Sequence, residues 1–331
     1  MTHLDAYNRP ISYLRISVTD RCNLRCRHCM PRDGVPLCSH HEILTYEEIE
    51  TIARAAAELG ISKVRLTGGE PLVRAGIVDL VRMLASIPGI DDLAMTTNGI
   101  HLSRHALALA EAGLLRVNVS LDSLRPERFQ RITRGGRLED VLRGMEAARQ
   151  VGLQPIKINT VVIRGTNDDE VVDFARKTMH EDWNVRFIEL MPVGSGVSIA
   201  DEWPEKIVIA QEIRPKVETV LGKLEPAKVS AGQGPARYYR LPGARGTLGF
   251  ITAVSDHFCY HCNRMRLTAD GQLRPCLLSD NELDLRTPLR HGVGIDEIKT
   301  LLVKAVESKP RRHHLAESDR PEKRAMSQIG G

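Results

Sequence analysis

The first two thirds of the chain alternate between short apolar segments and longer amphipathic ones. The short segments are rich in β-branched residues, as in YLRISVT, which is typical of strands. We expect strands at residues 13–19, 63–69, 93–99, 116–122, 155–163 and 185–194. Between them, the spacing of apolar residues predicts helices at residues 45–60, 76–87, 103–113, 137–151 and 167–180. The first helix has clear ends, because Thr45 and Glu48 form a capping box and Gly60 stops it.

Strands that alternate with helices of this length form parallel βαβ units. The six units predict an α/β fold in which residues 1–225 form an incomplete (β/α)6 barrel of TIM type. A standard barrel closes with eight strands, so we expect an open side. From about Pro226 the chain is rich in Gly and Pro, which indicates short strands and turns. We expect residues 226–331 to form a smaller C-terminal domain that covers the open side.

Composition narrows the class of protein. The chain has 331 residues, of which 42% are hydrophobic and 27% charged, an ordinary globular balance. A net charge of +4 is too small to indicate nucleic acid, and no apolar run is long enough to span a membrane. The N-terminal residues contain no apolar signal core, so we expect a cytoplasmic protein. In a reducing compartment, clustered cysteines indicate metal or catalytic sites rather than disulfides.

Three of the seven cysteines, Cys22, Cys26 and Cys29, lie in one short loop after the first predicted strand. Thiolates suit zinc and iron–sulfur clusters, and a closed structural zinc site needs four ligands. In a four-iron cube, three cysteines leave one iron free to bind a substrate or cofactor. Loops after barrel strands form the active-site face, which favours a cluster. The alternative is a structural zinc site, for which His28 is a poor fourth ligand.

A second group, Cys259, Cys262 and Cys276, also has three members. Zinc ribbons use four cysteines, so this group again leaves one position open. The seventh cysteine, Cys38, is distant in sequence and could supply a fourth ligand. We interpret Cys38 instead as a loop or core thiol.

The segment CNLRCRHC resembles the signature of the radical S-adenosylmethionine superfamily. In that superfamily S-adenosylmethionine chelates the free iron, and an aromatic residue usually precedes the third cysteine. Here His28 takes that position, and its planar ring can pack similarly. TGGEP, at residues 67–71, resembles the motif that contacts the methionine amino group, where glycines let the backbone approach a ligand.

Both cysteine spacings, together with GGEP, TTNG, SLD and NRMR in order, closely resemble the molybdenum cofactor biosynthesis protein A family, the GTP 3',8-cyclases. The resemblance covers nearly the whole chain. It implies two [4Fe-4S] clusters, one on each cysteine group, and catalytic roles for Cys22, Cys26, Cys29, Arg264 and Arg266. It implies S-adenosylmethionine binding by His28, Gly69, Ser120 and Met191. It also implies GTP binding by Arg15, Arg65, Thr96, Lys157, Arg264, Met265 and Arg266.

The chemistry of the charged side chains agrees with part of this assignment. Arginine and lysine inside a barrel are costly unless they meet anions, and a triphosphate supplies several. Lys157 and Asn159 should share one face of the fifth strand, and Arg264 and Arg266 should point the same way. The alternative for Arg65 or Lys157 is an ion pair with a core carboxylate such as Glu189.

The resemblance also implies a reaction and partners. A 5'-deoxyadenosyl radical would take hydrogen from C3' of GTP, and C3' would then bond to C8 of guanine. The product, 3',8-cyclo-7,8-dihydro-GTP, would pass to cyclic pyranopterin monophosphate synthase. Flavodoxin or ferredoxin would supply electrons, and a homodimer is compatible with this picture.

Two other functions fit parts of the sequence. One is a peptide-modifying radical enzyme with an auxiliary cluster, although we see no peptide-binding region. The other is an iron–sulfur electron carrier or a zinc-stabilised binding module, for which six βα units are excessive. The tail from residue 309 is polar, which indicates a mobile segment. The resemblance nevertheless implies that Gly330 and Gly331 reach the active site.

Overall fold

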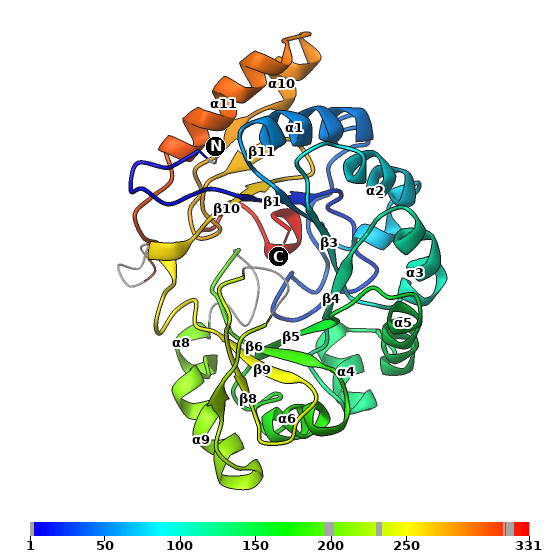
Figure 1. The fold of residues 1–331 in the computed structure, drawn as a ribbon, viewed down its shortest axis with the longest axis vertical. Coiled ribbons are helices and arrows are strands. Elements are labelled where there is room, and N and C mark those ends of the chain that lie inside the picture. The colour runs from blue at the N-terminus through cyan, green and yellow to red at the C-terminus, as the bar shows by residue number, and fades with distance from the viewer. Residues whose placement is uncertain (1–2, 195–201, 230–233, 314, 316–320, 331) are drawn as a thin grey trace.

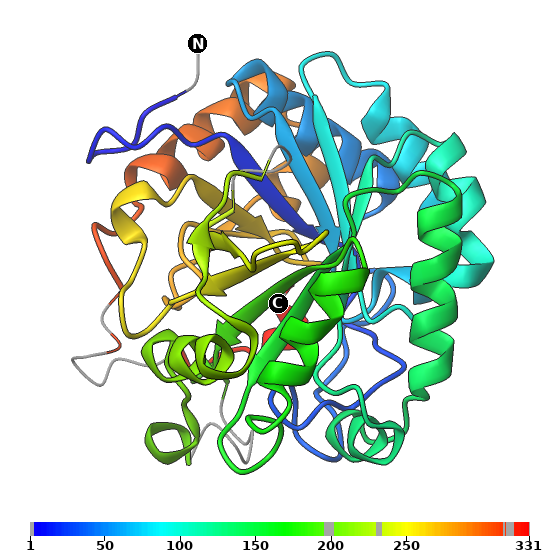
Figure 2. The same cartoon turned by 60° about the horizontal axis from the view of Figure 1, so that its bottom comes forward.

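A computed structural model describes residues 3–194, 202–229, 234–313, 315 and 321–330. In this part of the chain one 12-stranded sheet has the order β12-β11-β10-β1-β2-β3-β4-β5-β6-β9-β8-β7. The sheet curves around a central space, and most of the helices lie along its outside (Figures 1 and 2). Its two edges are β12 and β7, so the barrel is not closed.

The six predicted βα units are confirmed. Their parallel strands are β1 (Tyr13–Ser17), β2 (Lys63–Thr67), β3 (Asp92–Thr97), β4 (Arg116–Ser120), β5 (Lys157–Val162) and β6 (Asn184–Glu189). Their helices include α1 (Tyr46–Glu58), α2 (Ile77–Ala85), α3 (Leu102–Glu111), α5 (Leu138–Gln150) and α6 (Val171–His180). The capping box of α1 is present, since the Glu48 amide donates to Thr45 Oγ1 and the Thr45 amide donates to Glu48 Oε2.

Other helices were not expected from the sequence. They are α4 (Pro126–Thr133), α8 (Trp203–Lys206), α9 (Ala210–Leu221), α10 (Arg286–Arg290) and α11 (Ile295–Glu307), with a short 3-10 turn η1 at Pro71–Val73 and another, η2, at Cys259–His261. Helix α11 packs against α1. The region after Pro226 therefore contains helices as well as the short strands that its composition predicts.

Strands from the last third of the chain extend the sheet at both edges. Next to β6 lie β9 (Thr247–Ile251), β8 (Arg237–Arg240) and β7 (Glu225–Pro226), and next to β1 lie β10 (Arg264–Leu267), β11 (Gln272–Arg274) and β12 (Leu283–Asp284). Strands β9 and β10 pair in parallel with β6 and β1, so they continue the barrel wall. The open side is thus flanked from both directions by the C-terminal region.

The expectation of a mobile tail is wrong for the residues that the structure describes. The Arg324 guanidinium makes ion pairs to Asp270 at 2.8 Å and to Glu282 at 2.7 Å. A 3-10 turn, η4, follows at Met326–Gln328, and Ile329 is buried in a small apolar cluster with Val193. These contacts carry the end of the chain into the space inside the sheet (Figure 1). Gly331 lies outside the described residues.

Within the described residues, no helix combines the length and the apolar character that crossing a membrane requires. The core lies between the sheet and its outer helices, and it is built from aliphatic residues on the outward faces of the strands. The inward faces carry polar and charged residues instead. They define the candidate site.

Candidate active site

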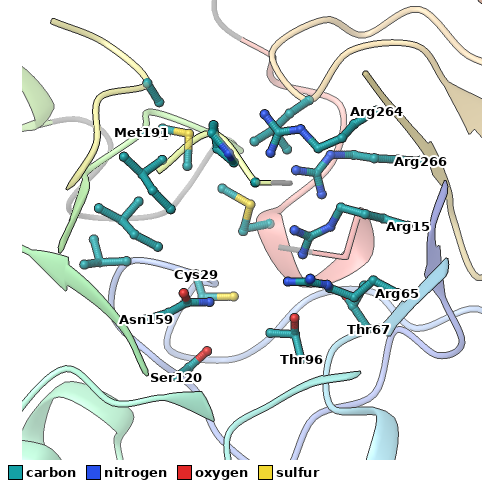
Figure 3. Close-up of a pocket in the computed structure, with 18 of the residues that line it drawn as sticks. Arg15, Cys29, Arg65, Thr67, Thr96, Ser120, Asn159, Met191, Arg264 and Arg266 are labelled. Carbon is teal, nitrogen blue, oxygen red and sulfur yellow. The ribbon is translucent and has the colours of Figure 1, made fainter. Parts of the chain in front are cut away.

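A large cavity fills the inside of the curved sheet. Both cysteine groups line it: Cys22, Cys26 and Cys29 from the loop after β1, and Cys259, Cys262 and Cys276 from the C-terminal region. All six cysteines are free thiols. Figure 3 shows four arginines pointing into the cavity from one wall, with Ser120, Asn159 and Met191 on the opposite wall. The fold therefore brings the two cysteine groups and the cations into one site.

The thiols of the first group are close to one another and largely buried. Burial raises the pKa of Cys22 to about 11 and that of Cys29 to about 12, and the charge of neighbouring cysteines adds to the rise for Cys26 and Cys29. The Leu24 amide donates to Cys22 Sγ at 3.4 Å. Such buried thiols become thiolates only when a metal replaces their protons.

Donor spacing and donor type differ between a single zinc ion and an iron–sulfur cluster. Zn–S bonds of about 2.3 Å place tetrahedral ligands roughly 3.8 Å apart. In an iron–sulfur cube each thiolate binds a different iron, so the sulfurs stand farther apart. Among the described residues, no three His, Cys, Asp or Glu side chains are arranged to hold one metal ion. The donor set is all thiolate, which suits a [4Fe-4S] cluster.

Glu70, in the GGEP segment, connects three sequence motifs. Its carboxylate accepts hydrogen bonds from the Leu72 and Asn98 amides at 3.0 and 2.6 Å and from the Thr97 hydroxyl at 2.7 Å. Asn98 then donates to Asn23 Oδ1 at 2.8 Å, beside Cys22. Burial raises the pKa of Glu70 to about 7, against these hydrogen bonds. Hydrogen bonds that link the segments GGEP, TTNG and CNLRC thus fix the base of the first cysteine loop.

The structure gives a reason for glycine at both positions of GGEP that differs from the expected approach to a ligand. A Cβ on Gly69 would lie 2.3 Å from the Arg21 carbonyl oxygen, and one on Gly68 would lie 2.7 Å from the Thr19 oxygen. The Gly69 amide donates to that Thr19 oxygen at 2.7 Å. The close approach is therefore to the protein's own cysteine loop. Gly69 also lines the cavity, so its role toward S-adenosylmethionine stays a prediction.

The other residues assigned to S-adenosylmethionine also line the cavity. Ser120 ends β4, and Met191 follows β6 and packs against the apolar cluster that holds the tail. His28 lies beside Asp122, with Nε2 3.7 Å from Oδ2. Asp122 in turn accepts from the Val161 amide at 2.8 Å, and this ties the ring position to β5.

The second cysteine group is held by two buried cations that the sequence did not single out. Lys309 Nζ donates to the Arg264 carbonyl at 2.8 Å, two residues after Cys262, and to the carbonyl of Pro275, which directly precedes Cys276. Arg9 Nη1 donates to the Cys259 carbonyl at 2.8 Å. Burial by itself would raise the pKa of Cys262, but the charges of Arg264 and Lys309 outweigh it and lower that pKa to about 6.

Cys38 is placed apart from both groups. It is half-buried, does not line the cavity, and its amide donates to Asp20 Oδ2 at 2.6 Å. This placement agrees with the interpretation of Cys38 as a loop thiol.

Three arginines form a row across adjacent strands. Arg15 on β1 is in register with Arg65 on β2 and with Arg266 on β10. Neighbouring strands are about 4.8 Å apart, so three guanidinium groups start from backbone positions side by side. All three line the cavity, and Arg15 and Arg266 have pKa values lowered by burial and by nearby arginines, that of Arg15 to about 10. Burying three like charges side by side is costly unless an anion lies against them.

Two more cations complete this wall. Burial, with Arg186, Arg116 and Arg65 nearby, lowers the pKa of Lys157 to about 7. Arg186, on β6, is buried, and within the described residues its Nε and Nη2 atoms have no hydrogen-bond partner. Arg186 was not predicted, although it alternates with the apolar Val185 and Phe187 in a predicted barrel strand, and this pattern is a signal for an inward position.

Glu189, the carboxylate named in the ion-pair alternative, has other partners. Glu189 accepts hydrogen bonds from Ser255 and the Val254 amide. Lys157, Asn159, Thr96 and Arg264 line the cavity as expected, and Arg264 stacks over the Phe258 ring at 4.8 Å. The Met265 side chain does not line it, because it points from β10 into the apolar core.

The penultimate residue meets this cationic row. The Gly330 carbonyl oxygen accepts hydrogen bonds from Arg266 Nη1 at 2.7 Å and from Arg15 Nη2 at 3.1 Å. Gly330 has φ of +72°, and a Cβ there would lie 2.8 Å from Thr67 Oγ1. The position therefore requires glycine, and the predicted reach of Gly330 into the site is confirmed.

Comparison with known proteins agrees with this geometry. Residues 16–178 match the radical SAM superfamily, and residues 183–315 match the family Molybdenum Cofactor Synthesis C. The chain is 56% identical to the GTP 3',8-cyclase of Pelotomaculum thermopropionicum over 99% of both chains, and 52% identical to that of Moorella thermoacetica with the same coverage. The chain belongs to the GTP 3',8-cyclase family. Both cysteine groups of this family member fall within the matched residues.

Solved structures show that the fold is shared more widely than the family. Streptococcus suis SuiB bound to the precursor peptide SuiA has a TM-score of 0.61, with 16% identity over 92% of this chain and 67% of that one. The structure of anSMEcpe with bound AdoMet has a TM-score of 0.53, with 16% identity over 91% and 82%. These likenesses show the radical SAM fold alone. The cyclase relatives therefore decide against the peptide-modifying alternative, and the carrier and zinc-module alternatives lose their basis.

Proposed function

We propose that the cavity converts GTP to 3',8-cyclo-7,8-dihydro-GTP, the first step of molybdenum cofactor biosynthesis. The observation that carries this proposal is the buried row Arg266–Arg15–Arg65 between two three-cysteine loops, in a chain at least half identical to GTP 3',8-cyclases. A polyanionic nucleotide supplies the negative charge that the row needs.

The first loop would hold a [4Fe-4S] cluster through Cys22, Cys26 and Cys29. When bound, this cluster supplies the electron that cleaves S-adenosylmethionine and so begins hydrogen abstraction from C3' of GTP. The chain itself fixes the loop through Glu70 and Asn98 and places Ser120, His28 and Met191 around the same cavity. These groups would orient S-adenosylmethionine.

The cationic wall would bind GTP. The row of arginines with Lys157 and Arg264 would clamp the triphosphate, which fixes the ribose relative to the first loop. The orphaned buried donors of Arg186 support this role, because buried polar atoms without partners indicate a missing ligand. The Gly330 carbonyl holds Arg15 and Arg266 in position meanwhile.

A second [4Fe-4S] cluster would be held by Cys259, Cys262 and Cys276, with its open iron toward the guanine edge. Support comes from the three thiols on one cavity and from the cations Lys309 and Arg9 that fix their loops. The lowered pKa of Cys262 favours a thiolate ligand there.

Two cysteine variants test this division of labour. After anaerobic reconstitution, Cys22→Ser should lose S-adenosylmethionine cleavage completely. Cys276→Ser should keep some cleavage, uncoupled from GTP, and lose the cyclised product. Iron content should fall by about half in each variant, and equal loss of cleavage in both would contradict separate roles for the two groups.

The remaining partners are proposals from the resemblance. They are cyclic pyranopterin monophosphate synthase as the consumer of the product and flavodoxin or ferredoxin as the electron donor. The cytoplasmic location and a homodimer belong with them, as does the domain boundary at residue 225.

A further inference from the structure

The outer side of the first cysteine loop carries a cluster of four arginines. This arginine patch consists of Arg25, Arg27 and Arg32 from the loop and Arg134 from the end of α4. Arg25, Arg32 and Arg134 line a surface hollow separate from the central cavity. Arg27 and Arg32 are exposed. Nothing in the reaction inside the cavity uses these side chains.

The patch is rigidly joined to the loop that carries the first cysteine group. The Arg25 and Arg27 amides donate to the carbonyls of Thr133 and Ile132, both at 3.0 Å. Arg25 Nη1 donates to the Cys22 carbonyl at 2.8 Å, and Arg134 Nη1 donates to the Met30 carbonyl at 3.3 Å. Two of the four guanidinium groups therefore touch the backbone at both ends of the cysteine motif.

The patch carries an excess of positive charge. Burial lowers the pKa of Arg134, and the charges of Arg27 and Arg32 lower it further, while Cys26 and Asp33 act in the opposite direction. Arg128 on α4 differs, because it makes ion pairs to Asp169 and Glu170. Within the described residues, no ion pair joins Arg27 or Arg32 to a carboxylate. Asp33 offsets only part of this charge, so the patch is a surface of net positive charge beside the first cysteine loop.

We propose that the arginine patch is the docking surface for a small acidic one-electron carrier protein. This inference rests on the proposed function, which requires one electron at the first cysteine group for each cleavage. The inner side of the loop faces the cavity that takes both organic molecules, so the outer side is the free approach for a protein. On docking, the carrier is oxidised by one electron and the cluster is reduced by one. No bond forms or breaks in that transfer.

Charge complementarity is the physical reason for this choice of partner. Opposite charges on two surfaces steer their encounter and raise the association rate, with a strong dependence on salt. An acidic carrier would meet several guanidinium groups directly above the cysteine loop. The proposal therefore predicts binding that weakens steeply as ionic strength rises.

The test uses the reconstituted holoenzyme and a purified acidic flavodoxin as the probe. The variant Arg27→Glu/Arg32→Glu reverses two exposed charges without removing a hydrogen bond of Arg25 or Arg134. Arg240→Glu is the matched control, because Arg240 is exposed on β8, in another part of the sheet. Flavodoxin affinity is measured by biolayer interferometry, and the rate of cluster reduction by stopped-flow absorbance, both at low and high salt.

The proposal predicts that the double variant loses at least about tenfold in flavodoxin affinity and reduction rate at low salt, and that the difference shrinks at high salt. The control should match the unaltered protein. Reduction by photoreduced 5-deazariboflavin, which is uncharged, should be equal in all three proteins. Unchanged flavodoxin affinity in the double variant would overturn the proposal. Failure of every protein to form product with the neutral reductant would instead contradict the proposed function.

Discussion

Arg266, Arg15 and Arg65 stand side by side because three parallel strands from distant parts of the chain share one register. Each strand alone contains an ordinary arginine that could have faced solvent. Together they place three charges in a buried wall, where repulsion and desolvation are costly without an anion. The Gly330 carbonyl satisfies part of this demand, and the triphosphate of GTP would satisfy the rest.

Arginine variants test this wall directly. Arg266→Ala and Arg264→Ala should each weaken GTP binding by about tenfold or more, since a charge-assisted hydrogen bond contributes about 1.5–3 kcal/mol. Arg266→Lys should recover only part of the affinity, because an ammonium lacks the fork that matches phosphate. GTP affinity is measured by equilibrium dialysis, with Arg240→Ala as control, and the visible spectrum of the first cluster should not change. Normal GTP affinity in both alanine variants would show that these arginines do not bind GTP and have a structural role instead.

We expect Lys157 to make GTP binding dependent on pH. Its pKa is lowered to about 7 in the free protein, chiefly by burial, and the bound triphosphate should raise it. Because GTP favours the protonated form, affinity should fall as pH rises above 7, until the pKa of the complex is reached. Lys157→Arg stays charged and should remove this part of the slope. GTP affinity is measured for the unaltered protein and for Lys157→Arg between pH 7.5 and 9, which extends to about two units above that pKa. Identical slopes in the two proteins would exclude Lys157 as the titrating group.

At the scale of elements, the sequence predicts the βα units well because periodicity and capping are local signals. It does not predict α4, whose buried residues are few and whose surface is rich in arginine. It also does not reveal that β9 and β10 continue the barrel wall, since pairing between distant strands leaves no local pattern. The two cysteine groups were predicted from their spacing, and the cations of β1, β2 and β5 from the family resemblance. Lys309 and Arg9 were missed because their partners are backbone carbonyls far along the chain.

The prediction of a mobile tail was wrong for the same reason, because the partners of its residues lie far along the chain. Its charged residues resemble a solvated end, but Arg324 pairs with Asp270 and Glu282, more than forty residues away. The ion pairs and the apolar contact of Ile329 deliver Gly330 to the arginine row. A polar segment is therefore a structural element of the site.

Gly330→Ala tests this element. The added methyl group meets Thr67 Oγ1 and also strains a left-handed backbone, so the tail should withdraw from the arginines. Cyclised product should fall at least about tenfold while both clusters and S-adenosylmethionine binding persist, because a displaced contact misorients the ribose. Deletion of Gly330 and Gly331 should have the same effect.

Gly243→Ala is the matched control for that variant. Gly243 has φ of +74°, close to that of Gly330, and open space around its Cβ position. The alanine there should cost about 1–2 kcal/mol of stability, because its backbone stays left-handed, and the variant should keep its activity. Full cyclase activity in Gly330→Ala, measured by product formation, would show that the tail contact is dispensable.

The whole molecule is a curved open sheet whose interior faces two cysteine loops and one cationic wall. The first loop comes from the start of the barrel, and the second comes from the region that extends both sheet edges. The tail contacts the arginine row that lies between the two loops. This arrangement would hold S-adenosylmethionine at one loop and GTP against the other, with the ribose between. The central claim is that the two molecules react with each other in this cavity.

One measurement tests that claim most directly. The reconstituted protein is incubated anaerobically with a reductant, S-adenosylmethionine and GTP that carries deuterium at C3', and the products are analysed by mass spectrometry. The account predicts that deuterium appears in 5'-deoxyadenosine and that 3',8-cyclo-7,8-dihydro-GTP forms in equal amount. Deuterium-free 5'-deoxyadenosine beside unchanged GTP would contradict it.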